Sequence, residues 1–383
     1  MKKLISVITA AILVLSVFSI CVNAEDYPEM QVEVKCKSAL LMETETGTVL
    51  MGYNADERLC PASVTKIMTL LLISEAVESG KISLEDTVTV SRNAAEKGGS
   101  QIWLKEGEQM SVDDLIKASA VASANDACTA LGELVAGSDT AFVKMMNDRA
   151  NELGMNNTHF ENCTGLDDTT DNHYTSAYDI ALMSREILKH DLILKYTNIW
   201  TDTLRNGATE LTNTNKLIRF YDGATGLKTG TTSKAGCCIS ATAKRDGLSL
   251  IAVVMGSDNS KDRFNSARAM LDWGFANYAF VTPEPDMSLI TDINVLGGKE
   301  DRITPVIKDS TGILVPKGKE GSIEQTVELP VDVEAPVEKG QLFGYVIFTL
   351  DSDEIARYSL ESDREIEKLN FIEKLTVILS AVF

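Results

Sequence analysis

The sequence contains few of the residues on which metal chemistry depends. It has only three histidines in 383 residues, and its seven cysteines form no Cys-x-x-Cys pair. No Cys/His cluster has the spacing of a zinc site, and no His-Glu-x-x-His motif occurs. We therefore expect neither a metal site nor a cofactor.

Other catalytic and ligand-binding motifs are missing as well. There is no Walker loop, no G-x-G-x-x-G fingerprint and no G-x-S-x-G elbow. A Ser-His-Asp triad would have to use His159, His173 or His190 without motif support, and His173 is expected to be a structural hydrogen-bonding residue at a helix start.

The chain is acidic: it has 36 Lys and Arg residues and 56 Asp and Glu residues, which gives a net charge of −20. This balance argues against nucleic-acid binding, which needs a basic surface.

The N-terminus has the organisation of a signal peptide. A basic start, Met1-Lys2-Lys3, precedes an apolar stretch from Leu4 to Val22, and Val22-Asn23-Ala24 fits the small-residue cleavage rule. We expect residues 1–24 to be removed and the mature chain to be exported, to the outer face of the cytoplasmic membrane or the cell wall. An uncleaved membrane anchor is the alternative.

One cysteine, Cys21, leaves with this segment. A domain of this size needs no disulfide framework, so we interpret the others as small core residues, with an occasional disulfide as the alternative. They are Cys36, Cys60, Cys128, Cys163, Cys237 and Cys238.

The first part of the mature chain predicts one sheet assembled from both ends of a domain. A hairpin is expected over residues 39–51 and adjacent strands over residues 237–242 and 248–254. Helical patterns lie between and after them, over residues 64–79, 112–122, 126–135, 141–153, 176–188 and 260–278.

The composition changes at Thr282-Pro283-Glu284-Pro285. Short β-type runs separated by Gly and Pro follow, over residues 303–307, 312–315, 323–329 and 340–350. We therefore predict a first domain over residues 25–281 and a small all-β domain over residues 282–358.

Residues 359–383 differ from the rest in character. Apolar residues recur at helical spacing from Arg364 to Phe383, but the first half is too charged to span a bilayer. An amphipathic helix that makes peripheral membrane contact is one interpretation, and a helix docked on the protein's own surface is the other.

The most informative stretch is Ser63-Val64-Thr65-Lys66, which opens an apolar helical run. A serine and a lysine three residues apart lie on one helix face, where a neutral lysine can take the serine's proton. The alternative is an N-cap serine with a surface lysine. Ser63 is therefore a candidate nucleophile and Lys66 a candidate base.

Two more short motifs follow in order. Ser123-Ala124-Asn125 falls in a break between two predicted helices, where Ser123 could relay a proton and Asn125 could hold a substrate carbonyl. Lys228-Thr229-Gly230-Thr231 would offer a cation, a hydroxyl and open backbone on a strand, so Lys228 and Thr229 could bind a carboxylate and Gly230 could admit an extended substrate. Helix capping and an ordinary β-turn are the respective alternatives, but the joint occurrence of the three motifs is specific.

This set, S-x-x-K, S-x-N and K-T-G, resembles the signature of penicillin-binding proteins and class A β-lactamases, with alanine where the pattern has aspartate. Nearly the whole chain is similar to the low-molecular-weight penicillin-binding proteins that act as serine-type D-alanyl-D-alanine carboxypeptidases. Similar segments also occur at residues 98–101, 164–167 and 222–230. The resemblance implies an α/β fold: a β-lactamase/transpeptidase-like domain, with an antiparallel sheet flanked by helices and a helical subdomain, followed by a small all-β domain.

The same resemblance implies a reaction. Ser63 would form an acyl-enzyme with a peptidoglycan muramyl pentapeptide, release the terminal D-alanine and bind β-lactam antibiotics covalently. It further implies an oxyanion hole from the Ser63 and Thr231 backbone N–H groups, and a role for Arg263 in holding the substrate carboxylate.

Three alternatives remain at this stage. A β-lactamase would need a water-activating group, which Glu152 in Glu152-Leu153-Gly154-Met155-Asn156 mimics superficially. An endopeptidase or transpeptidase could use the same fold. A catalytically inactive wall-binding protein is the third, although the intact motifs argue against it.

Overall fold

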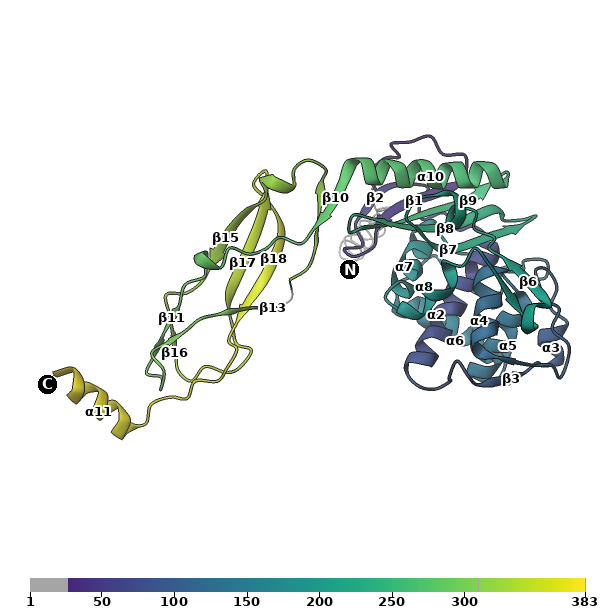
Figure 1. The fold of residues 1–383 in the computed structure, drawn as a ribbon. Coiled ribbons are helices and arrows are strands. Elements are labelled where there is room, and N and C mark those ends of the chain that lie inside the picture. The colour runs from purple at the N-terminus through teal and green to yellow at the C-terminus, as the bar shows by residue number, and fades with distance from the viewer. Residues whose placement is uncertain (1–26, 309, 383) are drawn as a thin grey trace, which may run out of the picture.

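The computed structural model describes residues 27–308 and 310–382. The expected signal peptide, residues 1–24, lies outside the described residues. The first part of the chain is built on a five-stranded antiparallel sheet in the order β2-β1-β9-β8-β7 (Figure 1). Its strands are β1 (Ser38–Glu43), β2 (Val49–Tyr53), β7 (Ala224–Thr232), β8 (Gly236–Arg245) and β9 (Leu248–Ser257). The two ends of the domain therefore meet in one sheet, as the sequence predicted.

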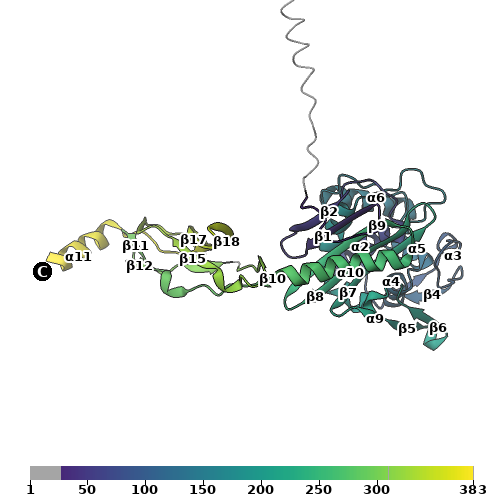
Figure 2. The same ribbon diagram turned by 90° about the horizontal axis from the view of Figure 1, so that it is seen from above.

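Strand β9 shows why this sheet is covered on both faces. Alternate residues of a strand point to opposite faces. Ile251, Val253 and Met255 belong to the core on one face, whereas Leu250 and Val254 belong to the core on the other. Helix α10 (Ser260–Asn277) packs on the second face, and a layer of helices covers the first (Figures 1 and 2).

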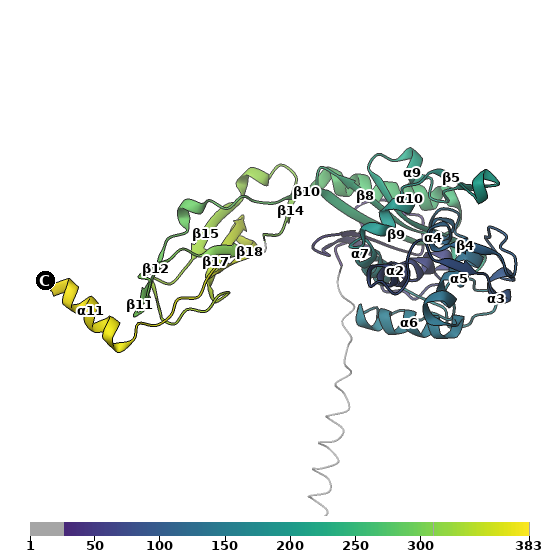
Figure 3. The same cartoon turned by 60° about the horizontal axis from the view of Figure 1, so that its bottom comes forward.

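The helical layer is centred on α2. Four consecutive residues of α2, Leu70 to Ile73, are buried, so this helix is enclosed on all sides. Around it lie the other helices of this layer, which Figure 3 shows from below. The bounds are α2 (Lys66–Glu78), α3 (Arg92–Ala95), α4 (Val112–Val121), α5 (Asn125–Ala136), α6 (Asp139–Glu152), α7 (Ala177–Ile187) and α8 (Asp191–Thr197).

Short elements connect these helices to the sheet. The side chain of Ser176 accepts a hydrogen bond from Asp179 N and caps α7, as its position predicted. The expected helix over residues 64–79 begins instead with a 3₁₀ turn, η1 (Ala62–Thr65). The remaining short elements are β3 (Thr87–Thr89), β4 (Gln109–Ser111), β5 (Thr201–Leu204), η2 (Arg205–Gly207), β6 (Thr209–Thr212) and α9 (Leu217–Phe220).

The second part is all β, as expected, and is joined to the first where β10 (Tyr278–Val281) pairs with β14 (Ile313–Pro316). The strand expected over residues 303–307 is interrupted at Pro305, which has no N–H to donate, and forms β12 and β13. The other elements are η3 (Met287–Leu289), β11 (Ile293–Leu296), β12 (Arg302–Ile303), β13 (Val306–Lys308), η4 (Glu320–Ser322), β15 (Glu324–Glu328), β16 (Asp332–Glu334), β17 (Leu342–Leu350) and β18 (Asp353–Glu361).

The expected helix from Arg364 to Phe383 is wrong in its first third. Helix α11 begins at Phe371, because Ile366 pairs with Val337 and is buried in the core of the β-rich part. The docked alternative is not supported either, since Phe371 and Ile372 are 82% and 74% exposed. Among the described residues, no helix combines the length and the apolar composition needed to cross a membrane.

Candidate active site

The nucleophile and base candidates meet at the junction of η1 and α2. Lys66 Nζ donates hydrogen bonds to Ser63 Oγ at 2.9 Å and to the carbonyl oxygen of Thr164 at 2.7 Å. The spacing of one turn therefore brings the two side chains together, as the sequence predicted. The sequence assigned no role to Thr164, because a backbone carbonyl has no signature in the amino-acid pattern.

Burial changes the acid–base properties of Lys66. Its side chain is completely buried, and the cost of desolvating an ammonium group lowers its pKa. A lowered pKa increases the fraction of neutral amine, which is the form that can accept the proton of Ser63. The surface-lysine alternative is therefore excluded by the structure.

A second buried lysine, Lys228, lies on β7. Burial and then the charge of Lys66 place the pKa of Lys228 well below its usual value. Lys228 Nζ donates to the Thr229 carbonyl at 2.9 Å, and Thr229 Oγ1 donates to Thr214 Oγ1 at 2.7 Å. Thr214 is a contact that the motif analysis did not identify.

Gly230 allows β7 to pack directly on the nucleophile's segment. A Cβ atom at position 230 would lie 2.8 Å from both the Pro61 carbonyl oxygen and the Ser63 nitrogen. The sequence analysis assigned this glycine to substrate approach, but the structure shows an additional cause, the close approach of η1. Only glycine fits between these atoms without displacing Ser63.

The turn between α4 and α5 presents Ser123 and Asn125. Asn125 N donates to the Ser100 carbonyl and Asn125 Nδ2 to the Gly98 carbonyl, both at 2.7 Å. The N-cap of α5 is Ala124 with no side-chain capping bond, so the capping alternative for this motif is wrong.

Ser123 is held in an uncommon conformation. Its φ is 62°, and such strain in a non-glycine residue is typical of functional sites. Ser123 Oγ and Asn125 Oδ1 are buried and have no protein partner among the described residues. These two oxygens therefore retain hydrogen-bonding capacity that the described residues do not use.

Arg263 approaches the same strand from the opposite face of the sheet. Its Nη1 donates to the carbonyl oxygens of Gly230 at 3.0 Å and Cys238 at 3.2 Å, and to Thr231 Oγ1 at 3.1 Å. The guanidinium thus fixes the end of β7 and places a positive charge behind Thr231. Burial lowers the pKa of Arg263 from its usual value.

The other candidate groups are not suited to catalysis. All six described cysteines are unpaired thiols, and burial raises the pKa of Cys60, Cys128 and Cys163, which keeps these groups protonated. Glu152, the water-activating candidate of a β-lactamase, ends α6, where its side chain is 65% exposed and pairs with Arg149. The structure therefore does not support the β-lactamase alternative.

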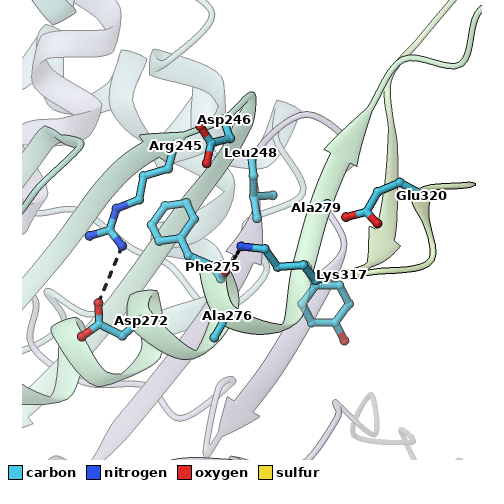
Figure 4. A pocket seen from close by; sticks show the side chains of 10 residues that line it. Arg245, Asp246, Leu248, Asp272, Phe275, Ala276, Ala279, Lys317 and Glu320 are labelled. Atoms are coloured by element: carbon cyan, nitrogen blue, oxygen red, sulfur yellow. Dashed lines mark hydrogen bonds and ion pairs between the residues drawn. The ribbon is translucent and has the colours of Figure 1, made fainter.

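A cavity of about 470 Å³ lies elsewhere, at the junction of the two parts of the chain (Figure 4). There Lys317 Nζ donates to the Phe275 carbonyl and Arg245 lies 3.9 Å from Asp272. None of the candidate catalytic residues lines this cavity, so it is separate from the site.

Comparisons with known proteins identify the family of this chain. A family model described as D-alanyl-D-alanine carboxypeptidase matches residues 23–259, and one described as the C-terminal domain of penicillin-binding protein 5 matches residues 286–368. The D-alanyl-D-alanine carboxypeptidase DacF of Bacillus subtilis is 39% identical, over 97% of this chain and 96% of its own.

Solved structures show the same fold. Penicillin-binding protein 5 of Haemophilus influenzae is 31% identical, with a TM-score of 0.77, covering 88% of this chain and 99% of its own. The ampicillin-bound penicillin-binding protein D2 of Listeria monocytogenes is 32% identical, with a TM-score of 0.59, and covers 64% of this chain and 100% of its own. The chain therefore belongs to the D-alanyl-D-alanine carboxypeptidase family and is a serine-type enzyme with the penicillin-binding-protein fold.

Proposed function

We propose that Ser63 is the residue through which this carboxypeptidase removes the terminal D-alanine of muramyl pentapeptide stems. The observation that carries the proposal is the 2.9 Å hydrogen bond between Ser63 Oγ and the fully buried Lys66 Nζ. Neutral Lys66 takes the hydroxyl proton, and Ser63 Oγ attacks the carbonyl carbon of the penultimate D-alanine.

The backbone around Ser63 stabilises the charge that develops. The N–H groups of Ser63 and Thr231 donate to the oxyanion of the tetrahedral intermediate, and one such donor contributes roughly 3 kcal/mol. The Ser123 hydroxyl relays a proton to the leaving amine, and D-alanine departs. Water then attacks the acyl-enzyme and frees the tetrapeptide.

Substrate binding uses the β7 side and the α5 side of the site. Lys228 and Thr229 bind the terminal carboxylate, with Arg263 behind Thr231 adding positive potential and holding the strand. Asn125 holds a substrate carbonyl, and Gly230 leaves the strand edge open.

β-Lactam antibiotics are proposed to acylate the same serine. In support, Listeria penicillin-binding protein D2, a structural neighbour, has been solved in ampicillin-bound and cefotaxime-bound forms. A β-lactam ring opened by Ser63 would remain attached until water removed it.

The proposed location is outside the cytoplasmic membrane, after removal of residues 1–24. We propose residues 25–281 as the catalytic unit. The β-rich unit begins at residue 282, and it continues beyond the predicted end at residue 358 because β18 ends at Glu361 and Ile366 packs in its core. Peripheral membrane contact, predicted from residues 364–383, is assigned to α11, where Phe371, Ile372 and Leu375 are exposed.

The test is D-alanine release from a purified muramyl pentapeptide. The wild-type enzyme should release one D-alanine per stem, and Ser63→Ala should lower kcat/KM by about 10⁴-fold or more. Retention of activity in a correctly folded Ser63→Ala variant would contradict the assignment of the nucleophile.

A further inference from the structure

Trp103 is the most exposed of the three tryptophans, with 75% of its surface accessible. It lies in the loop between α3 and β4 and has a φ of 59°. A left-handed backbone conformation is unfavourable for a bulky residue. An exposed tryptophan in strained backbone indicates that the fold holds this side chain outward for a purpose other than packing.

The residues on either side of Trp103 are fixed to a buried carboxylate. Ile102 N and Leu104 N donate to Asp126 Oδ2 at 3.2 Å and 3.0 Å, and Asp126 is completely buried. The Ile102 and Leu104 side chains are only 3% and 4% exposed. Because both neighbours point inward and are held by one carboxylate, the indole between them is forced toward solvent.

The loop is also fixed from outside. Arg205 lies in η2, the turn that connects β5 and β6. Its Nη1 donates to the Ile102 carbonyl at 2.9 Å, and its Nε donates to Glu108 Oε1 at 2.8 Å. Trp103 is therefore exposed on an ordered loop. Four hydrogen bonds hold the residues around it: two to Asp126 and two from Arg205.

This loop borders the active site. Its first residues supply the Gly98 and Ser100 carbonyls that accept from Asn125, and Asp126, which holds the loop, directly follows Asn125. Trp103 thus stands on the Asn125 side of the site, whereas Lys228 and Arg263 serve the β7 side. Trp103 follows Ser100 by three residues, so the two Cα atoms lie at most about 10 Å apart.

The chemistry of the substrate matches this position. Four amino acids separate the scissile bond of a muramyl pentapeptide from its sugar, a distance of about 13 Å in extended chain. The C–H bonds on one face of a pyranose ring carry partial positive charge, and the face of an indole carries partial negative charge. A sugar that leaves the site on the Asn125 side would therefore meet the exposed indole.

We propose that Trp103 is a stacking platform for the pyranose ring that carries the stem peptide. The inference rests on the proposed carboxypeptidase function and adds to it a subsite for the glycan. Trp103 binds the sugar and takes no part in the bond-making steps, so it determines specificity for saccharide-linked stems over free peptides.

The experiment compares two substrates in the mature full-length enzyme. The kcat/KM for D-alanine release is measured with a disaccharide pentapeptide and with the free pentapeptide. Trp103→Ala should lower kcat/KM about 3- to 10-fold for the saccharide substrate, the effect of one aromatic contact, and less than twofold for the free peptide. Trp103→Phe should restore most of the loss, and Phe220→Ala, which removes an exposed aromatic on α9, serves as the matched control.

The outcomes separate this inference from the proposed function. Equal losses on both substrates, or no loss on the saccharide substrate, would overturn the stacking role. Failure of the wild-type enzyme to release D-alanine from either substrate would instead contradict the proposed function. Titration with the disaccharide would then decide the stacking role: a saturable change in fluorescence that Trp103→Phe removes supports it, and an unchanged signal overturns it.

Discussion

The proposed chemistry of this site depends on two lysines that are buried without a carboxylate partner among the described residues. Lys66 and Lys228 are 0% and 1% exposed, and burial lowers the pKa of both. Charged lysines are rarely buried without pairing, so the protein accepts a cost in stability at neutral pH. The same burial makes Lys66 an amine that can act as a base, and it places Lys228 beside it as a group that can bind an anion.

The pH dependence of acylation follows from these lowered pKa values. In the proposed mechanism neutral Lys66 is the base, so the rate of acylation by benzylpenicillin should rise with pH and level off below the usual lysine pKa of 10.5. Stopped-flow acylation rates measured across this pH range test the prediction, and an acylation rate that does not change with pH would contradict Lys66 as the base.

The unfolding free energy should also depend on pH because of these lowered pKa values. Because the folded-state pKa values of these lysines lie below their unfolded values, the unfolded chain binds more protons between them. The contribution of these two lysines to the unfolding free energy should therefore increase as pH rises from their folded-state to their unfolded-state pKa values. This contribution is absent below the folded-state pKa values.

At this scale the sequence predicted that the Ser63 and Lys66 side chains would meet, but not which backbone group Lys66 would contact. Ser63 and Lys66 were predictable because helix geometry fixes their separation. The Thr164 carbonyl, which accepts from Lys66, comes from a loop about a hundred residues away in sequence. Its position depends on tertiary packing, which no local pattern encodes.

At the scale of elements, the site depends on how closely β7 approaches η1. Gly230 sets that distance, because a Cβ atom there would lie 2.8 Å from Ser63 N. His173 supports η1 from another side: its Nε2 is 2.8 Å from Thr65 Oγ1, while its Nδ1 accepts from Glu161 N. The prediction that His173 is a structural hydrogen-bonding residue is confirmed.

Gly230→Ala should therefore separate catalysis from folding. The added methyl group must displace Ser63 by several tenths of an ångström, which should lower the acylation rate on the order of 10²-fold. The unfolding free energy should fall by about 1–3 kcal/mol, as for other overpacked sites. Gly321→Ala, where the added atom meets no neighbour within 4 Å, is the control; a Gly230→Ala enzyme with wild-type rates would show that the spacing is not critical.

Element boundaries were the least predictable feature. Strand β18 was not expected, because the turn before it at Asp351 and Ser352 has positive φ values of 53° and 76° at residues other than glycine. Residues 364–370 carry helical apolar spacing, but Ile366 gains more by packing in the β-rich core than by extending α11. In both cases tertiary contacts override the local pattern.

At the scale of the whole molecule, the catalytic and β-rich parts follow one another and α11 lies at the far end of the chain (Figure 1). Within α11, Glu373 and Lys374 balance each other, while Phe371, Ile372 and Leu375 are exposed. An exposed apolar face without net charge favours burial in a lipid interface over electrostatic adsorption.

Membrane contact should therefore depend on apolar residues and persist at high salt. The mature protein should co-sediment with phosphatidylcholine vesicles, and replacing Phe371, Ile372 and Leu375 by glutamate should weaken binding by more than 10-fold because about three apolar side chains lose their burial. D-alanine release in solution should be unchanged by these substitutions. At 0.5 M NaCl, electrostatic interactions are screened beyond about 5 Å. Absence of wild-type binding, or loss of binding at this salt concentration, would contradict the assignment.

The most direct test of the central claim is the intact mass of the mature protein after brief exposure to benzylpenicillin. We predict one penicilloyl group per chain, mapped by peptide analysis to Ser63 and absent from Ser63→Ala. An adduct at another residue, or consumption of penicillin without any adduct, would contradict the account of Ser63 as the nucleophile of a slowly deacylating carboxypeptidase.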